Sequence, residues 1–173
     1  PEWFEDKQKI IGVRKAEHPK FVVVPDSYYV DQSVLIIRLT KHKQFSLDLL
    51  TAILNSKISH FWLFQQKRHG NQLQIDKEVL LHFPISNIDL SKPDNKHVCD
   101  ELVALASRMQ ELRRELAQNK EKGEDIFGEK RRELEDDFEK TSQRIDRSVY
   151  QLYGVTEEER QTIEASVVEL TRG

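Results

Sequence analysis

Residues 46–66, SLDLLTAILNSKISHFWLFQQ, decide how the first half of the chain folds. From Leu49 to Phe64 the apolar residues recur at steps of three and four, which predicts one helix with a broad buried face. Ser46 can cap its amino end, and Asp48 suits the positive end of the helix dipole. We expect the helix to run to about Gln66.

Three short apolar runs precede this helix, at residues 9–14, 21–24 and 33–39. The second is rich in β-branched residues and stops at Pro25, which indicates a strand followed by a turn. The third is apolar enough to be covered on both faces. The three runs together predict a small, mainly antiparallel sheet against which the helix packs.

The segments after the helix are shorter. Leu73 and Ile75 could form a short strand, and residues 76–81 could form one helical turn that residues 83–85 close. Gly70 is expected to end the helix or the loop after it.

Beyond residue 97 the pattern changes to heptads. One apolar seam has spacings of 4, 3, 4, 3 and 4 and consists of Val98, Leu102, Leu105, Met109, Leu112 and Leu116. After a break around residues 123–128, a second seam consists of Leu134, Phe138, Thr141, Ile145, Val149 and Leu152. Two such seams predict an antiparallel coiled-coil hairpin in which each helix buries one narrow stripe against the other. Thr156 and Glu159 have capping-box spacing, so a third, short helix should begin there.

Composition supports two unequal parts in an α+β protein. The 173 residues include 27 Lys or Arg and 30 Asp or Glu, with 38% hydrophobic residues, which is few for one large core. Residues 1–97 carry a net charge of +3 and residues 98–173 a net charge of −6. We therefore predict an α+β domain over residues 1–97 and a helical appendage over residues 98–173.

Several classes of protein are excluded or disfavoured. No apolar run approaches the roughly 18 residues that a membrane span needs, and no signal peptide is visible. The single cysteine, Cys99, excludes an intramolecular disulfide and fits the reducing cytoplasm. Pro1 is an unusual first residue, so we expect a fragment of a larger protein.

No catalytic or metal-binding constellation is found. Cys99 is expected to be an ordinary small residue at a helix start, and the six glycines are scattered singly rather than forming a phosphate loop. The histidines lack metal-ligand spacing, and the Asp136–Asp137 pair is expected on a solvated helix face. The sequence therefore predicts no catalytic residue, no metal site and no enzyme activity in this chain by itself.

The densest polar segment is residues 65–74. Arg and Lys can donate to guanine or phosphate, and Gln and Asn can pair bidentately with adenine. The candidate DNA-binding residues are Lys67, Arg68, His69, Asn71, Gln72 and Gln74. The alternative is a solvated loop, and the second basic cluster, Lys41-His42-Lys43, is more simply a turn.

Four phrases together resemble one family. They are YYVDQS at 28–33, LTAILNSK at 50–57, LLHFPI at 80–85 and IDRSVYQLYGVTEEE at 145–159. In this order they resemble the TaqI-like C-terminal specificity domain of N6-adenine DNA methyltransferases, including the type IIG restriction–modification enzymes. The resemblance spans roughly residues 9–165, with mild departures at Phe83, Ser148 and Val155.

The resemblance implies a DNA-recognition role. Such a domain binds a short target in double-stranded DNA and presents it to a methyltransferase domain of the same polypeptide, which would hold S-adenosylmethionine and flip out the adenine. The methyltransferase's N-P-P-Y-type motif is absent here, so this chain is expected to need no cofactor of its own. Asn55 and Ser56 are expected to cap or bond within the fold, Pro84 to set a turn, and Tyr150 and Tyr153 to pack. Recognition loops vary with the target, so the resemblance transfers no base-reading residue.

A second hypothesis has no DNA contact. The helical hairpin resembles the spacer helices of type I specificity subunits, and it could bind a partner helix or join two copies of the chain. That hypothesis predicts an exposed apolar stripe on the hairpin and no basic face on the first half.

Overall fold

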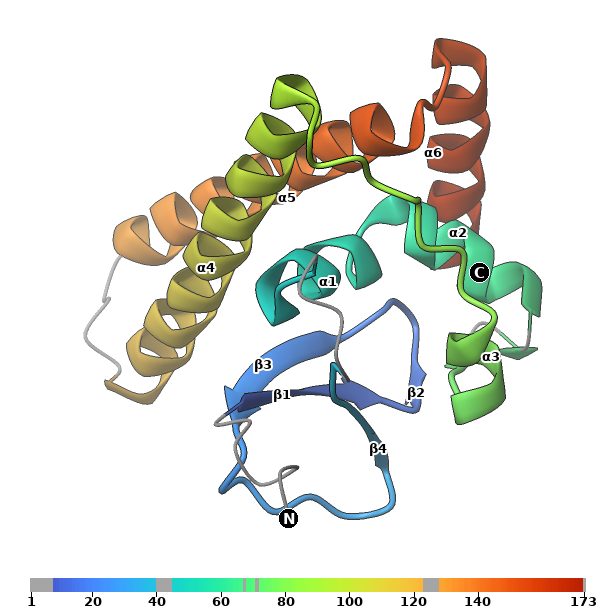
Figure 1. The fold of residues 1–173 in the computed structure, drawn as a ribbon. Coiled ribbons are helices and arrows are strands. Elements are labelled where there is room, and N and C mark those ends of the chain that lie inside the picture. Colours follow the sequence, from blue (N-terminus) through green and yellow to red (C-terminus); the bar gives the residue numbers. More distant parts are fainter. Residues whose placement is uncertain (1–7, 40–44, 67, 71, 123–127, 173) are drawn as a thin grey trace.

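The computed structural model describes residues 8–39, 45–66, 68–70, 72–122 and 128–172 (Figure 1). The elements in chain order are β1 (Gln8–Val13), β2 (Lys15–Ala16), β3 (Phe21–Pro25), β4 (Val34–Ile37), α1 (Leu47–Leu54), α2 (Lys57–Gln66), β5 (Arg68–His69), β6 (Gln72–Gln74), α3 (Lys77–Leu81), α4 (Pro93–Lys122), α5 (Glu129–Tyr153) and α6 (Glu157–Arg172). The α+β class, the helical hairpin and the C-terminal helix are confirmed.

The first sheet is antiparallel, in the order β3-β1-β4. Its inner face carries the fully buried Ile10 and Phe21, and α1 covers it (Figure 1). Gly12 lies opposite Phe21 in the register, and a Cβ atom at Gly12 would come within 2.4 Å of the Phe21 ring. The glycine therefore makes room for the aromatic ring at the centre of the core.

The connection from β3 to β4 crosses the outer side of the sheet. Both strands are antiparallel to β1, so residues 26–33 must return along β1 to reach the start of β4. Lys9, only 4% exposed, holds this crossover loop, because its Nζ donates to the backbone oxygens of Asp26 (2.9 Å) and Tyr28 (2.6 Å). The buried ammonium thus provides a donor for two backbone oxygens of the crossover loop.

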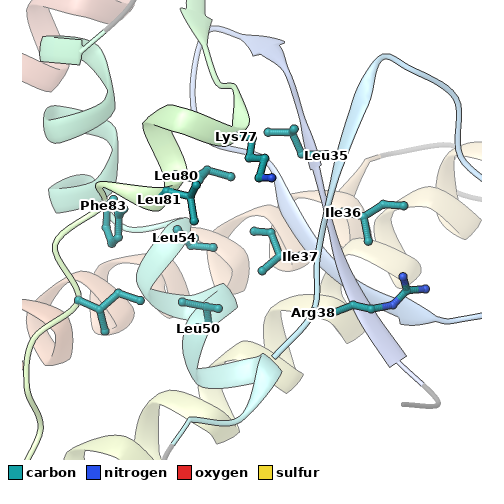
Figure 2. Close-up of a pocket in the computed structure, with 11 residues that line it drawn as sticks. Leu35, Ile36, Ile37, Arg38, Leu50, Leu54, Lys77, Leu80, Leu81 and Phe83 are labelled. Atoms are coloured by element: carbon teal, nitrogen blue, oxygen red, sulfur yellow. The ribbon is translucent and has the colours of Figure 1, made fainter. Parts of the chain in front are cut away.

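The expectation that the third apolar run is covered on both faces is wrong. Leu35 is buried, but Ile36 is 47% exposed on the side of β4 away from α3 (Figure 2). A short crossover loop covers less of a sheet face than a helix does, which leaves part of β4 open.

The expectation of one helix over residues 46–66 is also wrong, although its ends are correct. Ser46 caps α1 by accepting from the Leu49 N–H (3.0 Å), and α2 ends at Gln66. The helix breaks at Asn55, whose side chain accepts from the Phe21 N–H and donates to the Phe21 oxygen, both at 2.9 Å. Ser56 then donates to the Ile53 oxygen (2.7 Å). Asn55 and Ser56 do bond within the fold, as expected.

The two long helices form an antiparallel hairpin. Arg108 pairs with Asp137 (2.8 Å) and Glu101 pairs with Arg144 (2.9 Å). Residue numbers therefore rise along α4 as they fall along α5, so the two helices are antiparallel. The seam is wider than the predicted narrow stripe, because α1 packs into the hairpin. Cys99 and Ala106 are buried although they lie outside the predicted seam.

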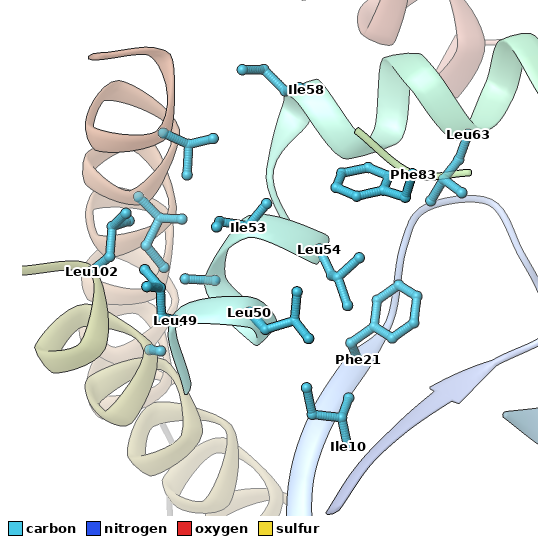
Figure 3. Close-up of a cluster of buried hydrophobic side chains, with 14 of the residues drawn as sticks. Ile10, Phe21, Leu49, Leu50, Ile53, Leu54, Ile58, Leu63, Phe83 and Leu102 are labelled. Atoms are coloured by element: carbon cyan, nitrogen blue, oxygen red, sulfur yellow. The ribbon is translucent and has the colours of Figure 1, made fainter. Parts of the chain in front are cut away.

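One hydrophobic core joins the two halves of the sequence. Leu49, Ile53 and Leu54 of α1 lie between the sheet residues Ile10 and Phe21 on one side and the hairpin on the other (Figure 3). Tyr153, near the end of α5, donates its hydroxyl to the Pro84 oxygen (3.0 Å). The division of the chain near residue 97 stays a prediction.

The last helix begins as expected. The Thr156 N–H donates to the Glu159 carboxylate (2.8 Å), and the Glu159 N–H donates to the Thr156 hydroxyl (3.3 Å), which completes a capping box. Gly154 ends α5 in the left-handed conformation, with φ at 65°.

The Asn55 contact generates a stability prediction. Asn55→Ala removes both partners of the Phe21 backbone, and we expect it to lower the free energy of unfolding by about 2–4 kcal/mol. Asn55→Asp should also be destabilising, because a carboxylate oxygen would replace the amide that donates to the Phe21 and Thr51 oxygens. Asn95→Ala is the matched control, because Asn95 makes one exposed hydrogen bond to the Asp89 oxygen. Equal losses for Asn55→Ala and Asn95→Ala in urea unfolding would contradict the assignment.

Candidate nucleic-acid interface

The predicted polar segment forms a β-hairpin. Strands β5 and β6 pair through the register Arg68–Leu73 and His69–Gln72, and Gly70 in the turn has φ at 61°. β6 also pairs with β2, which gives a second sheet in the order β2-β6-β5. The short strand expected at Leu73 and Ile75 is present as β6, which ends at Gln74.

The candidate residues fall into three groups. Lys67 and Asn71 lie outside the described residues. Arg68 and His69 are placed only by the β5 backbone. Gln72 is exposed and Gln74 is half-buried, while Leu73 between them is fully buried and Ile75 is 2% exposed. This alternation anchors β6 in the core and turns its amide side chains outward.

Two cations missed by the sequence analysis lie beside these amides. Lys15, in β2, is the cross-strand partner of Gln74, and Arg14 precedes it. The Arg14 backbone connects three segments, since its N–H donates to the Ser33 oxygen (3.1 Å) and its oxygen accepts from the Ile75 N–H (2.8 Å). Arg14 and Lys15 are exposed, and neither has an ion pair in the described part of the chain. Adjacent basic residues directly after an apolar run were the signal for them.

The crossover loop presents two aromatic side chains to solvent. Tyr28 is 58% and Tyr29 100% exposed. The loop is held at both ends, by Lys9 at its start and by Asp31 near its end, which accepts from the Ser33 N–H (2.8 Å). These hydrogen bonds from Ser33 lower the pKa of Asp31, so its carboxylate stays charged. The tyrosines therefore project from a fixed support, and Ser33 connects that support to Arg14.

A polar cavity of about 220 Å³ lies between α2, α5 and α6. Asp146 is buried beside it and accepts from the Lys57 N–H (2.8 Å), while the Lys57 ammonium is 3.6 Å from its other oxygen. Burial raises the pKa of Asp146 to about 6, which the contacts with Lys57 partly offset. A carboxyl with a raised pKa is a candidate acid–base group. Here both carboxylate oxygens contact Lys57 at the start of α2, so Asp146 links α5 to α2 in a structural role.

Other reactive groups have structural surroundings. Burial raises the pKa of the Cys99 thiol, which disfavours the nucleophilic thiolate. Burial, and then the nearby His18, lowers the pKa of His60, so His60 is neutral near pH 7. Within the described ranges, no group of three or more His, Cys, Asp or Glu side chains could hold a metal ion. In the same ranges, no helix is both long and apolar enough to cross a membrane.

Part of the chain matches a known protein family. Residues 1–85 match the TaqI-like C-terminal specificity domain. The matched range thus includes both sheets, α1, α2 and α3, and with them Arg14, Lys15, Gln72 and Gln74. The resemblance seen in the sequence is confirmed over this range. A specificity domain of this kind acts in DNA target recognition and is not catalytic by itself. No curated protein matches the chain with significant similarity.

The hairpin and the closing phrase at residues 145–159 lie outside the match, so the resemblance there stays a prediction. They are nevertheless bonded to the specificity domain. Asp146 accepts from the start of α2, and Tyr153 bonds to the oxygen of Pro84. Two residues of the closing phrase thus hold the hairpin against the matched region.

The raised pKa of Asp146 predicts a pH-dependent stability. The folded state binds the Asp146 proton more tightly than the unfolded chain, whose carboxyl titrates near 3.8. The stabilising contribution is therefore complete below pH 3.8 and is lost as the pH rises through about 6. Asp146→Asn keeps an oxygen for the Lys57 N–H but does not titrate.

The measurement is urea unfolding at several pH values. Between pH 4 and pH 6 the wild type should lose on the order of 2–3 kcal/mol relative to Asp146→Asn. Asp136→Asn is the control, because Asp136 lies exposed on the same helix in a pair with Lys140. Parallel pH curves for wild type and Asp146→Asn would rule out a raised pKa at this site.

Proposed function

We propose that this chain is the DNA sequence-recognition part of a restriction–modification adenine methyltransferase, of the class that includes the type IIG enzymes. It would position a DNA duplex for a catalytic domain of the same polypeptide. The observation that carries the proposal is the specificity-domain match over residues 1–85, because this range contains the outward-facing amides and the adjacent cations.

The geometry of the second sheet suits a DNA groove. The major groove of B-DNA is about 12 Å wide and admits a two-stranded β-ribbon. We propose that the β5–β6 hairpin enters it turn-first, so that Gln72 next to the turn reads a base edge. Arg14 and Lys15 at the base of the hairpin would then neutralise phosphates, which fixes the position of the protein on the duplex. Tyr28 and Tyr29 would extend this surface.

The remaining parts of the proposal concern the larger protein. S-adenosylmethionine would be bound by the catalytic domain, which would carry out the methyl transfer in the cytoplasm. The α4–α5 hairpin would act as a spacer that holds the specificity domain at a fixed distance from other domains. Its attachment through Asp146 and Tyr153 supports a rigid rather than a hinged spacer.

The second candidate is an interaction or spacer module without DNA contact, including a homodimer through the hairpin. It predicts an exposed apolar stripe. In the described part of the hairpin, Leu112 and Leu134 toward its tip are buried, as are Leu102 and Val149 toward its base. The seam is thus satisfied within one chain, which favours DNA recognition over dimerisation through the seam.

The salt dependence of DNA binding tests the proposal. Each phosphate contact contributes about 0.9 to the slope of log affinity against log salt concentration. We expect Lys15→Ala and Arg14→Ala each to lower this slope by about one contact on a random-sequence duplex. Lys130→Ala, on the exposed surface of α5, is the control and should leave the slope unchanged. Failure of the wild type to bind duplex DNA at low salt would refute the function.

Base reading is tested separately by selection from a randomised duplex library. Gln72→Ala should relax the preference at one position of the selected sequence, at a cost of about 1–3 kcal/mol for that base pair. It should leave the salt slope unchanged, because the amide carries no charge. An unaltered selected sequence would remove Gln72 from the reading surface while leaving the phosphate contacts in place.

A further inference from the structure

An apolar cavity of about 360 Å³ runs along the free side of β4. Four successive residues, Leu35, Ile36, Ile37 and Arg38, line one wall. Neighbouring side chains of a strand point to opposite faces, so a cavity that touches four in succession must follow the edge of the strand. Figure 2 shows the opposite wall, which comes from α3, and the floor, which comes from α1. We call this cavity the β4 groove.

The edge of β4 offers backbone hydrogen bonds to an incoming chain. The Arg14 N–H donates to the Ser33 oxygen, so in the ladder between β1 and β4 the bonded pairs are Gly12–Leu35 and Ile10–Ile37. Ile36 lies in the alternate, non-bonded position, which points its N–H and C=O away from β1 and toward the groove. Among the described strands, β4 has no neighbour on this side.

The walls of the groove offer an apolar anchor site. Leu81 is 71% exposed and Ile85 is 46% exposed, while Leu50 and Leu54 form a buried floor. Exposed apolar side chains beside a concave apolar surface are typical of a contact site. The volume is sufficient for one or two large aliphatic side chains.

The charges at the groove favour an acidic partner. Lys77 lies on the wall formed by α3 and is exposed, with no ion pair in the described part of the chain. Arg38, on the opposite wall, is paired with Asp26. A carboxylate on the incoming segment would therefore give Lys77 an ion-pair partner that it lacks among the described residues.

We propose that the β4 groove binds an extended segment of a partner protein by strand addition. The segment pairs with the backbone of Ile36, inserts a large aliphatic side chain against Leu81, and places an Asp or Glu beside Lys77. Main-chain hydrogen bonds supply affinity in this mode, and the alternate side chains supply specificity. The site does not include Gln72, Gln74 or Lys15, so the proposal is independent of DNA binding.

The test is an NMR titration of the full chain with a synthetic peptide. The probe is a seven-residue peptide in which Val-Leu-Val is flanked on each side by Thr and then Asp, with both ends blocked. Its symmetry permits either strand direction. We expect saturable shift changes confined to β4, α3 and the floor residues of α1. A peptide with N-methylated amides around Leu should bind at least about tenfold more weakly, because it cannot pair with Ile36.

Two protein variants locate the contacts. Leu81→Asp should weaken binding by about tenfold or more, since burial of a leucine contributes about 1.5–3 kcal/mol. Lys77→Glu should weaken binding of the Asp peptide and improve binding of the same peptide with Lys in place of Asp. Val168→Asp, a similar change at an exposed position of α6, is the control. Leu81 is largely exposed, so Leu81→Asp should keep the melting temperature near that of the wild type.

Each other outcome overturns the proposal. Absence of saturable shifts shows that the groove does not accept a strand. Equal binding of the N-methylated peptide shows an apolar pocket without strand pairing, and an unchanged charge preference in Lys77→Glu removes the acidic partner. A wild-type dimer in sedimentation that Leu81→Asp dissociates shows that a second copy of the chain occupies the groove.

Discussion

The paired hydrogen bonds between Asn55 and the Phe21 backbone are the constraint on which the rest of the structure depends. They stop α1 in the middle of an apolar pattern that would otherwise continue, and they fix the break to the edge of β3. The chain can then turn, so that α1 covers the sheet and reaches the hairpin while α2 leads to the second sheet. Phe21 sits over Gly12 at the same point, which ties the backbone pairing to the centre of the core.

The α4–α5 hairpin is hydrogen-bonded to the matched residues 1–85 and does not merely follow them in sequence. Asp146 supplies the acceptor that the first turn of α2 lacks, and Tyr153 reaches the oxygen of Pro84. The two contacts join residues that lie 89 and 69 positions apart in the sequence. The α4–α5 hairpin is thus in direct contact with α2, the helix that precedes the β5–β6 hairpin.

Features with a local cause were predictable from the sequence. Heptad spacing located both long helices, the capping box located α6, and β-branched runs located β1, β3 and β4. The break at Asn55 was not predictable, because its cause is a hydrogen-bonding partner 34 residues away. The candidate site was found only in part for a similar reason. Lys15 becomes a neighbour of Gln74 because β2 pairs with β6. β2 has only two residues, so no local sequence pattern predicts this pairing.

The crossover loop has a consequence for how recognition could diversify. Lys9 binds the loop through the backbone oxygens of residues 26 and 28, which every amino acid has. The side chains at the apex, Tyr28 and Tyr29, play no part in that attachment. Substitutions of Tyr28 and Tyr29 can therefore change the outer surface of the loop while its hydrogen bonds to Lys9 remain. The fold thus separates the groups that hold the crossover loop from the side chains that the loop presents to solvent.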